Sequence, residues 1–242
     1  MSSVKEIQSV HNACRLFEAI ARMQPVGVSD LARDIGIDKS AAHRLAITLH
    51  SARWLERTED GRWSISPAIL PTIRESAATT LVAGTRPLLE AARDQSGEMS
   101  MLVVPDGNRL MIVDSAESRQ TLRASVTVGT EMPARTSSAL RAIAAHLPAH
   151  ELVPWRRIDP SLTDSALAAV RARGWAQNDG EGFDGTRAVG AALRRSDGLP
   201  VAALVLCAPA SRFQPELMQQ HGELVARLAE SWQAERRPTL SG

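Results

Sequence analysis

A short stretch in the N-terminal part of the chain carries polar and basic side chains at helical spacing. Ser40, His43, Arg44 and Ile47 lie at offsets 0, 3, 4 and 7, so they share one face of a helix. An arginine such as Arg44 can bind guanine through two hydrogen bonds, and His43 can donate or accept one. Lys39 and Ser40 suit phosphate oxygens. This stripe therefore has the chemistry needed to bind base edges and backbone in a DNA groove.

The helix that must position this stripe is marked by local signals at both ends. Asp38 is an N-cap type, and the helix is expected to run to about Ser51. Its inward face is expected to consist of Ala41, Leu45, Leu49 and Ala52. A shorter helix over 30–35 precedes it, with Ser29 as the expected N-cap and Gly36 as the left-handed C-cap. Two helices joined this tightly are typical of a helix-turn-helix, and Ser29 is counted among its candidate DNA contacts.

Further elements on both sides complete this unit. An earlier helix, ended by Pro25 and Gly27, is expected to bury the stripe Ile7, Val10, Cys14, Phe17 and Ala21. After the helix that ends near Ser51, two short runs of residues flank Asp60-Gly61, which is a strong β-hairpin signal. Arg62 at the hairpin tip is a candidate contact to the minor groove or to phosphate. Residues 1–66 are thus predicted to form a winged helix-turn-helix, and the alternative is a helical bundle whose charges only face solvent.

The rest of the chain predicts a linker and a second domain of mixed structure. Pro67 and Pro71 mark a boundary, and 68–80 is expected to form a linker helix within a linker over 67–84. Residues 85–242 are expected to form an α+β domain with a largely antiparallel sheet. Its expected strands are 99–104, 109–114, 122–128, 188–194 and 201–207, and its expected helices are 86–97, 135–147, 165–173 and 215–236.

Length and composition agree with a globular protein of two domains or of one large domain. The chain has 242 residues, 44% of them hydrophobic, and a net charge of only +1, so no global basic field indicates nucleic acid. Cys14 and Cys207 lie among apolar neighbours without metal-ligand spacing. No apolar run reaches the length of a membrane span, and no secretory signal is present, so a cytoplasmic location is expected.

Several short motifs together resemble the IclR family of bacterial regulators over nearly the whole chain. The resemblance rests on Gln8-Ser9-Val10, Leu31-Ala32 with Gly36, Lys39-Ser40 with Arg44-Leu45, Glu117-Ser118 with Leu122-Arg123, Gly129 with Pro133, Arg173-Gly174-Trp175-Ala176, and Cys207-Ala208-Pro209 before Arg212. It implies a winged helix-turn-helix, a linker helix and a GAF-like effector-binding domain. It also implies dimers or tetramers on a pseudo-palindromic operator and a small organic effector.

The sequence departs from this family at the effector site. Family members that sense small keto acids bind them through an acidic residue, a cysteine and two serines. The resemblance places these four positions at Asn178, Ala188, Val205 and Cys207 of this sequence. The family's Pro-Leu-His-Ala-Thr segment is here Pro133-Ala134-Arg135-Thr136-Ser137. Fewer polar groups favour a larger, flatter and more apolar ligand, because unpaired buried donors penalise a poor fit.

Other residues of this domain are candidates for binding the effector. Thr136, Ser137 and Ser138 open a helix, where free N–H groups favour an anion, although plain capping is an equal alternative. A carboxylate contact could come from Arg123, Arg135 or Arg187. An adaptable apolar wall could come from Met99, Met101, Met111 and Met132, for which ordinary core packing is the alternative. The hypothesis is an aromatic carboxylic acid of the hydroxybenzoate type.

Three further patterns carry little weight. Gly180 to Gly185 matches G-x-G-x-x-G but leads into a strand, so a loop near the pocket is expected instead of a dinucleotide site. His146 and His150 are separated by Pro148, which argues against a zinc pair. No nucleophile elbow occurs, so neither catalysis, a metal nor a cofactor is expected.

The sequence as a whole predicts a ligand-responsive regulator of a catabolic operon. One alternative is a binding protein or enzyme whose N-terminal helices only mediate dimerisation. The other is an architectural DNA-binding protein.

Overall fold

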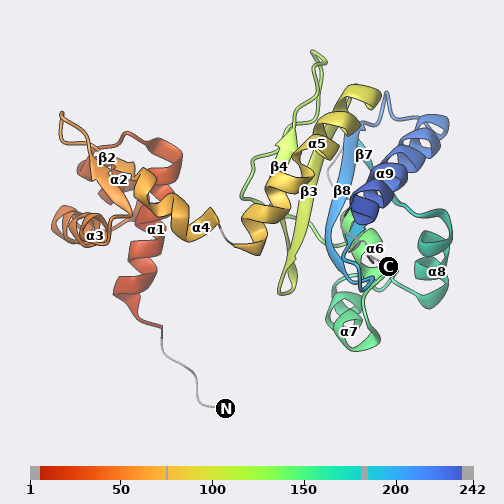
Figure 1. The fold of residues 1–242 in the computed structure, drawn as a ribbon, viewed down its shortest axis with the longest axis horizontal. Coiled ribbons are helices and arrows are strands. Elements are labelled where there is room, and N and C mark those ends of the chain that lie inside the picture. Colours follow the sequence, from red (N-terminus) through yellow and green to blue (C-terminus); the bar gives the residue numbers. More distant parts are fainter. Residues whose placement is uncertain (1–5, 75, 181–184, 236–242) are drawn as a thin grey trace, which may run out of the picture. The chain divides into compact units, whose positions relative to one another are not determined.

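The chain folds into two units, Met1–Thr80 and Leu81–Gly242, which are described separately (Figure 1). The computed structural model describes residues 6–74, 76–180 and 185–235. None of the helices in these ranges combines the length and the apolar character that a bilayer crossing requires.

The N-terminal unit begins with the helices α1 (Gln8–Met23), α2 (Val28–Ile35) and α3 (Lys39–Ser51). The turn between α2 and α3 forms as predicted. Gly36 ends α2 with φ +71°, a conformation that glycine adopts without a Cβ penalty. The carboxylate of Asp38 then accepts a 2.9 Å hydrogen bond from the N–H of Ala41 and caps α3.

The buried faces of these helices differ from the predicted ones. The face of α1 that packs inward is Leu16, Ala19 and Ile20, with Phe17 half-buried, whereas Ile7, Val10, Cys14 and Ala21 are exposed. The fully buried residues of α3 are Ala42 and Ala46. Leu45 and Leu49 pack at the edge of this core, Ala41 is only partly buried, and Ala52 is exposed. Alanine lets two helices approach closely, so the true contact stripe consists of the smallest side chains.

Ser29 is not the N-cap of α2. Gly27 occupies that position, and its backbone oxygen accepts hydrogen bonds from Asp30 and Leu31 without help from a side chain. Ser29 instead lies exposed in the first turn.

The hairpin forms where it was predicted. Strands β1 (Leu55–Arg57) and β2 (Trp63–Ile65) pair antiparallel, with Arg57 opposite Trp63. Leu55 and Trp63 are buried against the three helices, so the hairpin is anchored in the same core. Gly61 has φ +80° in the connecting turn.

The helices after the hairpin begin and end at other residues than predicted. A short η1 (Pro67–Ile69) leads into α4 (Leu70–Arg74), and α5 then runs from Ala77 to Ser96. The predicted break between helices 68–80 and 86–97 is therefore wrong, because α5 runs without interruption through that region. Pro87 is accommodated inside α5, and the hydroxyl of Thr85 bonds to the carbonyl of Leu81.

A six-stranded antiparallel sheet organises the C-terminal unit. Its order is β5-β4-β3-β8-β7-β6. The strands are β3 (Met99–Asp106), β4 (Arg109–Ala116), β5 (Glu131–Met132), β6 (Ala176–Asn178), β7 (Thr186–Arg194) and β8 (Pro200–Pro209). β3 pairs antiparallel with β4 and β7 with β8, so the prediction of a largely antiparallel sheet is confirmed.

Helices cover both faces of this sheet (Figure 1). One face packs against α5 and α9 (Pro215–Glu235), with Leu89, Val225 and Trp232 in the core between them. The other face packs against α6 (Ser138–Ala144), α7 (Ala149–Ile158) and α8 (Asp164–Arg173). The mixed α+β architecture agrees with the prediction.

Some predicted elements of this unit are wrong or were missed. Residues 122–128 form no strand, although Ala124 and Val126 alternate inward, because β4 bonds instead to residues 129–132. The helix predicted over 135–147 is the shorter α6. Neither α7, which contains Pro154, nor β6 was predicted.

Candidate functional site

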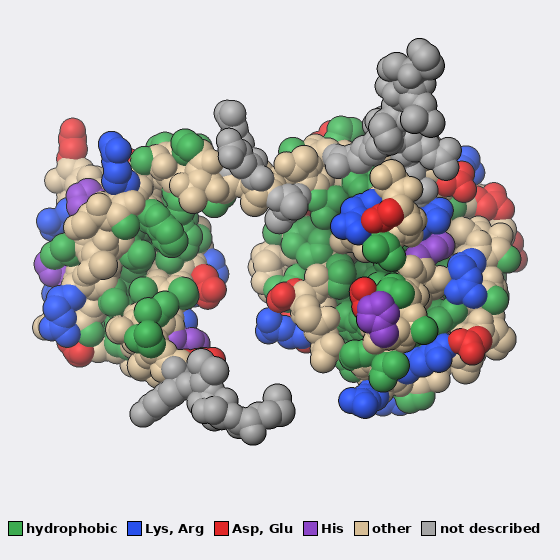
Figure 2. All heavy atoms as spheres, turned by 60° about the horizontal axis from the view of Figure 1, so that its bottom comes forward, with side chains coloured by type: hydrophobic (Ala, Val, Ile, Leu, Met, Phe, Trp, Pro, Cys, Tyr) green, Lys and Arg blue, Asp and Glu red, His purple; other side chains and the backbone are tan. Residues whose placement is uncertain are grey.

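A groove of about 460 Å³ lies between the start of α3 and the hairpin. Its lining residues are Val28, Lys39, Ser40, His43, Arg44, Arg57, Gly61 and Trp63. Lys, Arg and His side chains gather along the edge of the N-terminal unit on which α3 lies (Figures 1 and 2). No carboxylate is among the lining residues, so an anionic backbone such as that of DNA suits the groove.

Four of the predicted DNA contacts meet in this groove, namely Lys39, Ser40, His43 and Arg44. Ile47 lies on α3 with 44% of its surface exposed but does not line the groove. Ser29 and Arg62 do not line it either.

Arg62 is engaged within the hairpin turn. Its Nε lies 3.1 Å from a carboxylate oxygen of Asp60. The hydrogen bond from Thr58, with the charge of Arg62 beside it, holds the pKa of Asp60 below its usual value although the small burial of this carboxyl works in the opposite direction. Arg57 takes the place at the groove that was expected for Arg62. The hairpin register was the available signal, since it sets Arg57 opposite Trp63 on one face.

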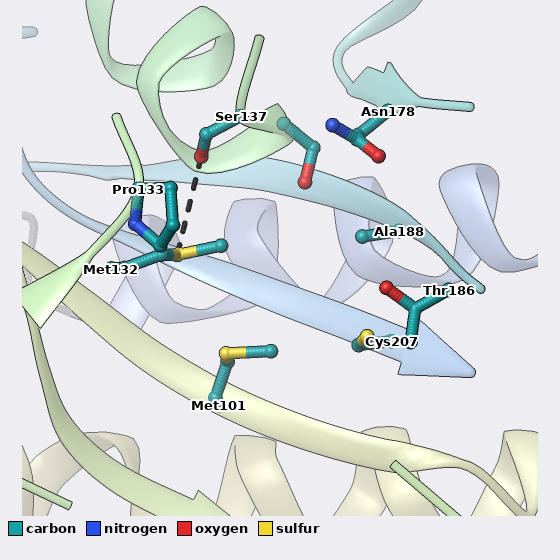
Figure 3. Close-up of a pocket in the computed structure, with 9 residues that line it drawn as sticks. Met101, Met132, Pro133, Ser137, Asn178, Thr186, Ala188 and Cys207 are labelled. Atoms are coloured by element: carbon teal, nitrogen blue, oxygen red, sulfur yellow. Dashed lines mark hydrogen bonds between the residues drawn. The ribbon is translucent and has the colours of Figure 1, made fainter. Parts of the chain in front are cut away.

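A second site lies in the C-terminal unit, between the start of α6 and the sheet (Figure 3). Its lining residues are Met101, Met132, Pro133, Ser137, Ser138, Asn178, Thr186, Ala188 and Cys207. The free volume between them is about 10 Å³, roughly the space of one water molecule. None of these lining side chains is a carboxylate, a cation or a histidine. Burial raises the pKa of the Cys207 thiol to about 11, so this group stays protonated and uncharged.

Half of the predicted effector contacts lie around this pocket. They are Met101, Met132, Ser137, Ser138, Asn178 and Cys207. Met99 and Val205 are buried in the core beside it, and Thr136, Arg123, Arg135 and Arg187 do not line it. Ala188, which the resemblance placed at an effector position, also lines the pocket and pairs directly with Cys207. Pro133 and Thr186 line it as well and were not among the predicted contacts.

The predicted arginines are directed elsewhere. Arg187 pairs with Asp179 and donates a 3.1 Å hydrogen bond to the carbonyl of Phe213. Arg123 lies 3.5 Å from a carboxylate oxygen of Glu117. Arg135 is exposed. The structure thus does not bring a cation to the pocket from these three positions.

Most polar groups of the pocket already have partners. The Ser137 hydroxyl accepts hydrogen bonds from the N–H groups of Ala139 and Leu140, so it caps α6 and leaves these two donors unavailable to an anion. Asn178 bonds through both ends of its amide, to the carbonyl of Thr136 and the N–H of Gly180. By contrast, the Ser138 hydroxyl is buried and, among the described residues, has no hydrogen-bond partner.

The residue before this cap has an unusual backbone. Thr136 has φ +62°, which is costly for a β-branched residue. Its N–H donates a 3.0 Å hydrogen bond to a carboxylate oxygen of Asp159. Burial works to raise the pKa of Asp159, but the hydrogen bonds from Ser161 and Thr136 outweigh it and lower that pKa. The ionised carboxylate therefore helps to hold the turn in place.

The remaining motifs contribute no site in the described ranges. No group of His, Cys, Asp and Glu there could hold a metal ion, and His146 and His150 are not brought together as ligands. Residues 181–184 of the glycine-rich segment lie outside the described residues. The prediction that this loop lies near the pocket falls on these residues.

Comparison with known proteins agrees with both units. Residues 9–59 match the family model of the IclR helix-turn-helix domain, and residues 76–233 match that of the bacterial transcriptional regulator IclR C-terminal domain. The acetate operon repressor of Salmonella typhimurium and the transcriptional repressor IclR of Escherichia coli are each 25% identical over 241 residues, covering 93% of this chain and 88% of theirs.

Solved structures share the fold along the whole chain. The Thermotoga maritima IclR has a TM-score of 0.72 at 19% identity, covering 95% of this chain and 99% of its own. An IclR homologue from Microbacterium hydrocarbonoxydans, solved in complex with 4-hydroxybenzoate, has a TM-score of 0.76 at 19% identity, covering 96% and 100%.

The relatives decide between the functions that the sequence left open. The two curated relatives are named as repressors, and residues 9–59 match a helix-turn-helix family model, so the alternative of a binding protein or enzyme whose N-terminal helices only dimerise is not supported. A helix-turn-helix with a basic groove precedes a helix-covered antiparallel sheet, and both parts match the same family. The chain is a DNA-binding transcriptional regulator and belongs to the IclR family.

Proposed function

We propose that this regulator senses a small aromatic carboxylic acid of the hydroxybenzoate type and controls an operon for its catabolism from the cytoplasm. The observation that carries the proposal is the character of the pocket. Met101, Met132, Pro133 and Ala188 contribute apolar surface to it, and the Ser138 hydroxyl, for which the described residues supply no partner, offers a hydrogen bond. Such a lining favours a ring over a small, strongly hydrated keto acid.

The likeness to the homologue bound to 4-hydroxybenzoate supports this ligand class at the level of the fold. Because the described lining carries no cation, the carboxylate would be bound by neutral donors or lie toward the pocket entrance. Methionine side chains can move aside for a ring, since they are unbranched and have several rotatable bonds.

The proposed output is a change in operator affinity. A homodimer or tetramer would present two copies of the groove to the half-sites of a pseudo-palindromic operator. Effector binding would shift the population between arrangements of the two DNA-binding units through the linker helices α4 and α5. The side chains that would contact DNA are Lys39, Ser40, His43, Arg44 and Ile47, with Arg44 binding a base.

Titration calorimetry of the full-length protein tests the ligand class. The panel is benzoate, 3- and 4-hydroxybenzoate and 3,4-dihydroxybenzoate, with glyoxylate and pyruvate as the competing class. Binding of a ring acid, together with a changed affinity for the upstream intergenic DNA in a gel shift, is expected. Heat with glyoxylate or pyruvate alone would overturn the proposal.

A further inference from the structure

The two arginines of the hairpin have different surroundings. Arg62 pairs with Asp60 at 3.1 Å and has Nη1 3.5 Å from the carbonyl of Pro25. Arg62 is thus held by groups of its own unit outside the groove, and it does not line the groove. Arg57 lines the groove and makes no ion pair with any residue of the described ranges.

Arg57 is held in position by uncharged groups. Its Nε donates a 3.2 Å hydrogen bond to the carbonyl of Gly61, and its guanidinium carbon lies 5.6 Å from the centre of the Trp63 ring. Trp63 is itself only 3% exposed, so it is a fixed platform. A cation over an aromatic face is attracted by the ring quadrupole without losing its charge.

Gly61 provides the space for this arrangement. It has φ +80°, and a Cβ built there would lie 3.2 Å from Nη2 of Arg57. The guanidinium thus lies directly against the turn. A side chain ordered in this way loses less conformational entropy when it binds an anion than a freely rotating one.

We propose that Arg57, and not Arg62, is the contact of the hairpin to the DNA backbone. Arg57 faces the same groove as Lys39, Ser40 and Arg44, and a phosphate there meets donors from both α3 and β1. The planar guanidinium can offer two parallel N–H groups to phosphate oxygens. The contact fixes the orientation of α3 on the duplex and carries no base preference.

The test compares Arg57→Gln, Arg57→Lys and Arg62→Gln in the full-length protein. Binding to a duplex selected from a random pool, and to an unselected duplex, is measured by fluorescence anisotropy from 50 to 300 mM KCl (roughly the range in which phosphate contacts dominate the salt effect). Arg57→Gln is expected to weaken both by the same factor, about tenfold, and to lower the salt slope by about one. Arg62→Gln is expected to change affinity less than about twofold.

Arg57→Lys separates a DNA contact from a role in folding. Lysine retains the positive charge but lacks the two parallel N–H groups of the guanidinium. The salt slope is therefore expected to equal that of the wild type, while affinity falls about threefold. Circular dichroism and urea unfolding show whether Arg57→Gln is folded. An Arg57→Gln protein with wild-type affinity and slope, a larger loss in Arg62→Gln, or a loss restricted to the selected duplex would each overturn the assignment.

Discussion

The side-chain amide of Asn178 donates a 2.8 Å hydrogen bond to the backbone carbonyl of Thr136. This bond joins β6 to the turn that precedes α6, and Asp159 holds the N–H of the same residue at the end of α7. Thr136 is thereby fixed on both sides at φ +62°. Two hydrogen bonds thus offset a backbone cost of about 1–3 kcal/mol, and they place Ser137 and Ser138 at the pocket.

Replacing Asn178 by aspartate tests this arrangement. Asn178→Asp replaces the amide donor by an acceptor that faces the carbonyl of Thr136, so a loss of about 1–3 kcal/mol in the free energy of unfolding is expected. Urea denaturation measures it. Gln177→Ala on the same strand is the control and should cost less than half as much, since its side chain holds no part of the turn. Equal losses would contradict the role given to Asn178.

Removing the hydroxyl of Ser138 is expected to separate stability from ligand binding. Ser138→Ala eliminates a buried hydroxyl to which the described part of the chain offers no partner, so the free energy of unfolding should stay the same or rise by about 1 kcal/mol. Affinity for the aromatic acid found by calorimetry should fall about tenfold, the worth of one hydrogen bond. Ser137→Ala is the contrasting control, because losing the N-cap of α6 should cost about 1 kcal/mol of stability. A Ser138→Ala protein with unchanged affinity would remove this hydroxyl from the site.

The variant Arg44→Ala is expected to bind the selected duplex more weakly by about 1–3 kcal/mol and to have a relaxed base preference at one position. Competition anisotropy with single-base variants measures both. Arg33→Ala on α2 is the matched control, since Arg33 is exposed, pairs with Asp30 and does not line the groove. Equal weakening on selected and unselected duplexes would assign Arg44 to phosphate.

The pH dependence of stability should reveal His146. Burial first, and then the charges of Arg194 and Arg171, lower the pKa of His146 to about 4. The unfolded chain, with an ordinary pKa near 6.5, binds more protons between these values, so stability is complete above about pH 6.5 and falls as the pH drops toward 4. The loss should be on the order of 1 kcal/mol, because the imidazole is only partly shielded from water.

His146→Gln should flatten the unfolding free energy measured in urea across this window. His221 also has a pKa lowered by burial, opposed by Glu98, so it contributes to the slope that remains. An unchanged slope in His146→Gln would show that His146 remains in contact with water.

Local chemistry was predictable from the sequence where a single residue determines the backbone. Gly36 and Asp38 define the turn before α3 because each acts on its own neighbours in the chain. The faces of helices were less predictable. In α1, apolar residues such as Val10 compete with Leu16 for the inward face, and only the packing of the other helices decides between them.

The sites depended still more on contacts between distant residues. Ser138, Asn178 and Cys207 meet because three separate elements pack together, which spacing alone cannot show. The direction of an arginine side chain depends on which carboxylate the fold places within ion-pair distance of its guanidinium. Asp60 pairs with Arg62, and Asp179 pairs with Arg187, so both predicted contacts lie away from their sites.

The small volume of the pocket has a consequence for the speed of any response. A cavity of about 10 Å³ does not admit a benzene ring, which needs roughly 150 Å³. An aromatic effector would therefore bind only those molecules in which Met101 and Met132 have moved aside, and its apparent affinity would be reduced by the fraction of molecules in that state. Its association rate would fall below that of diffusional encounter for the same reason.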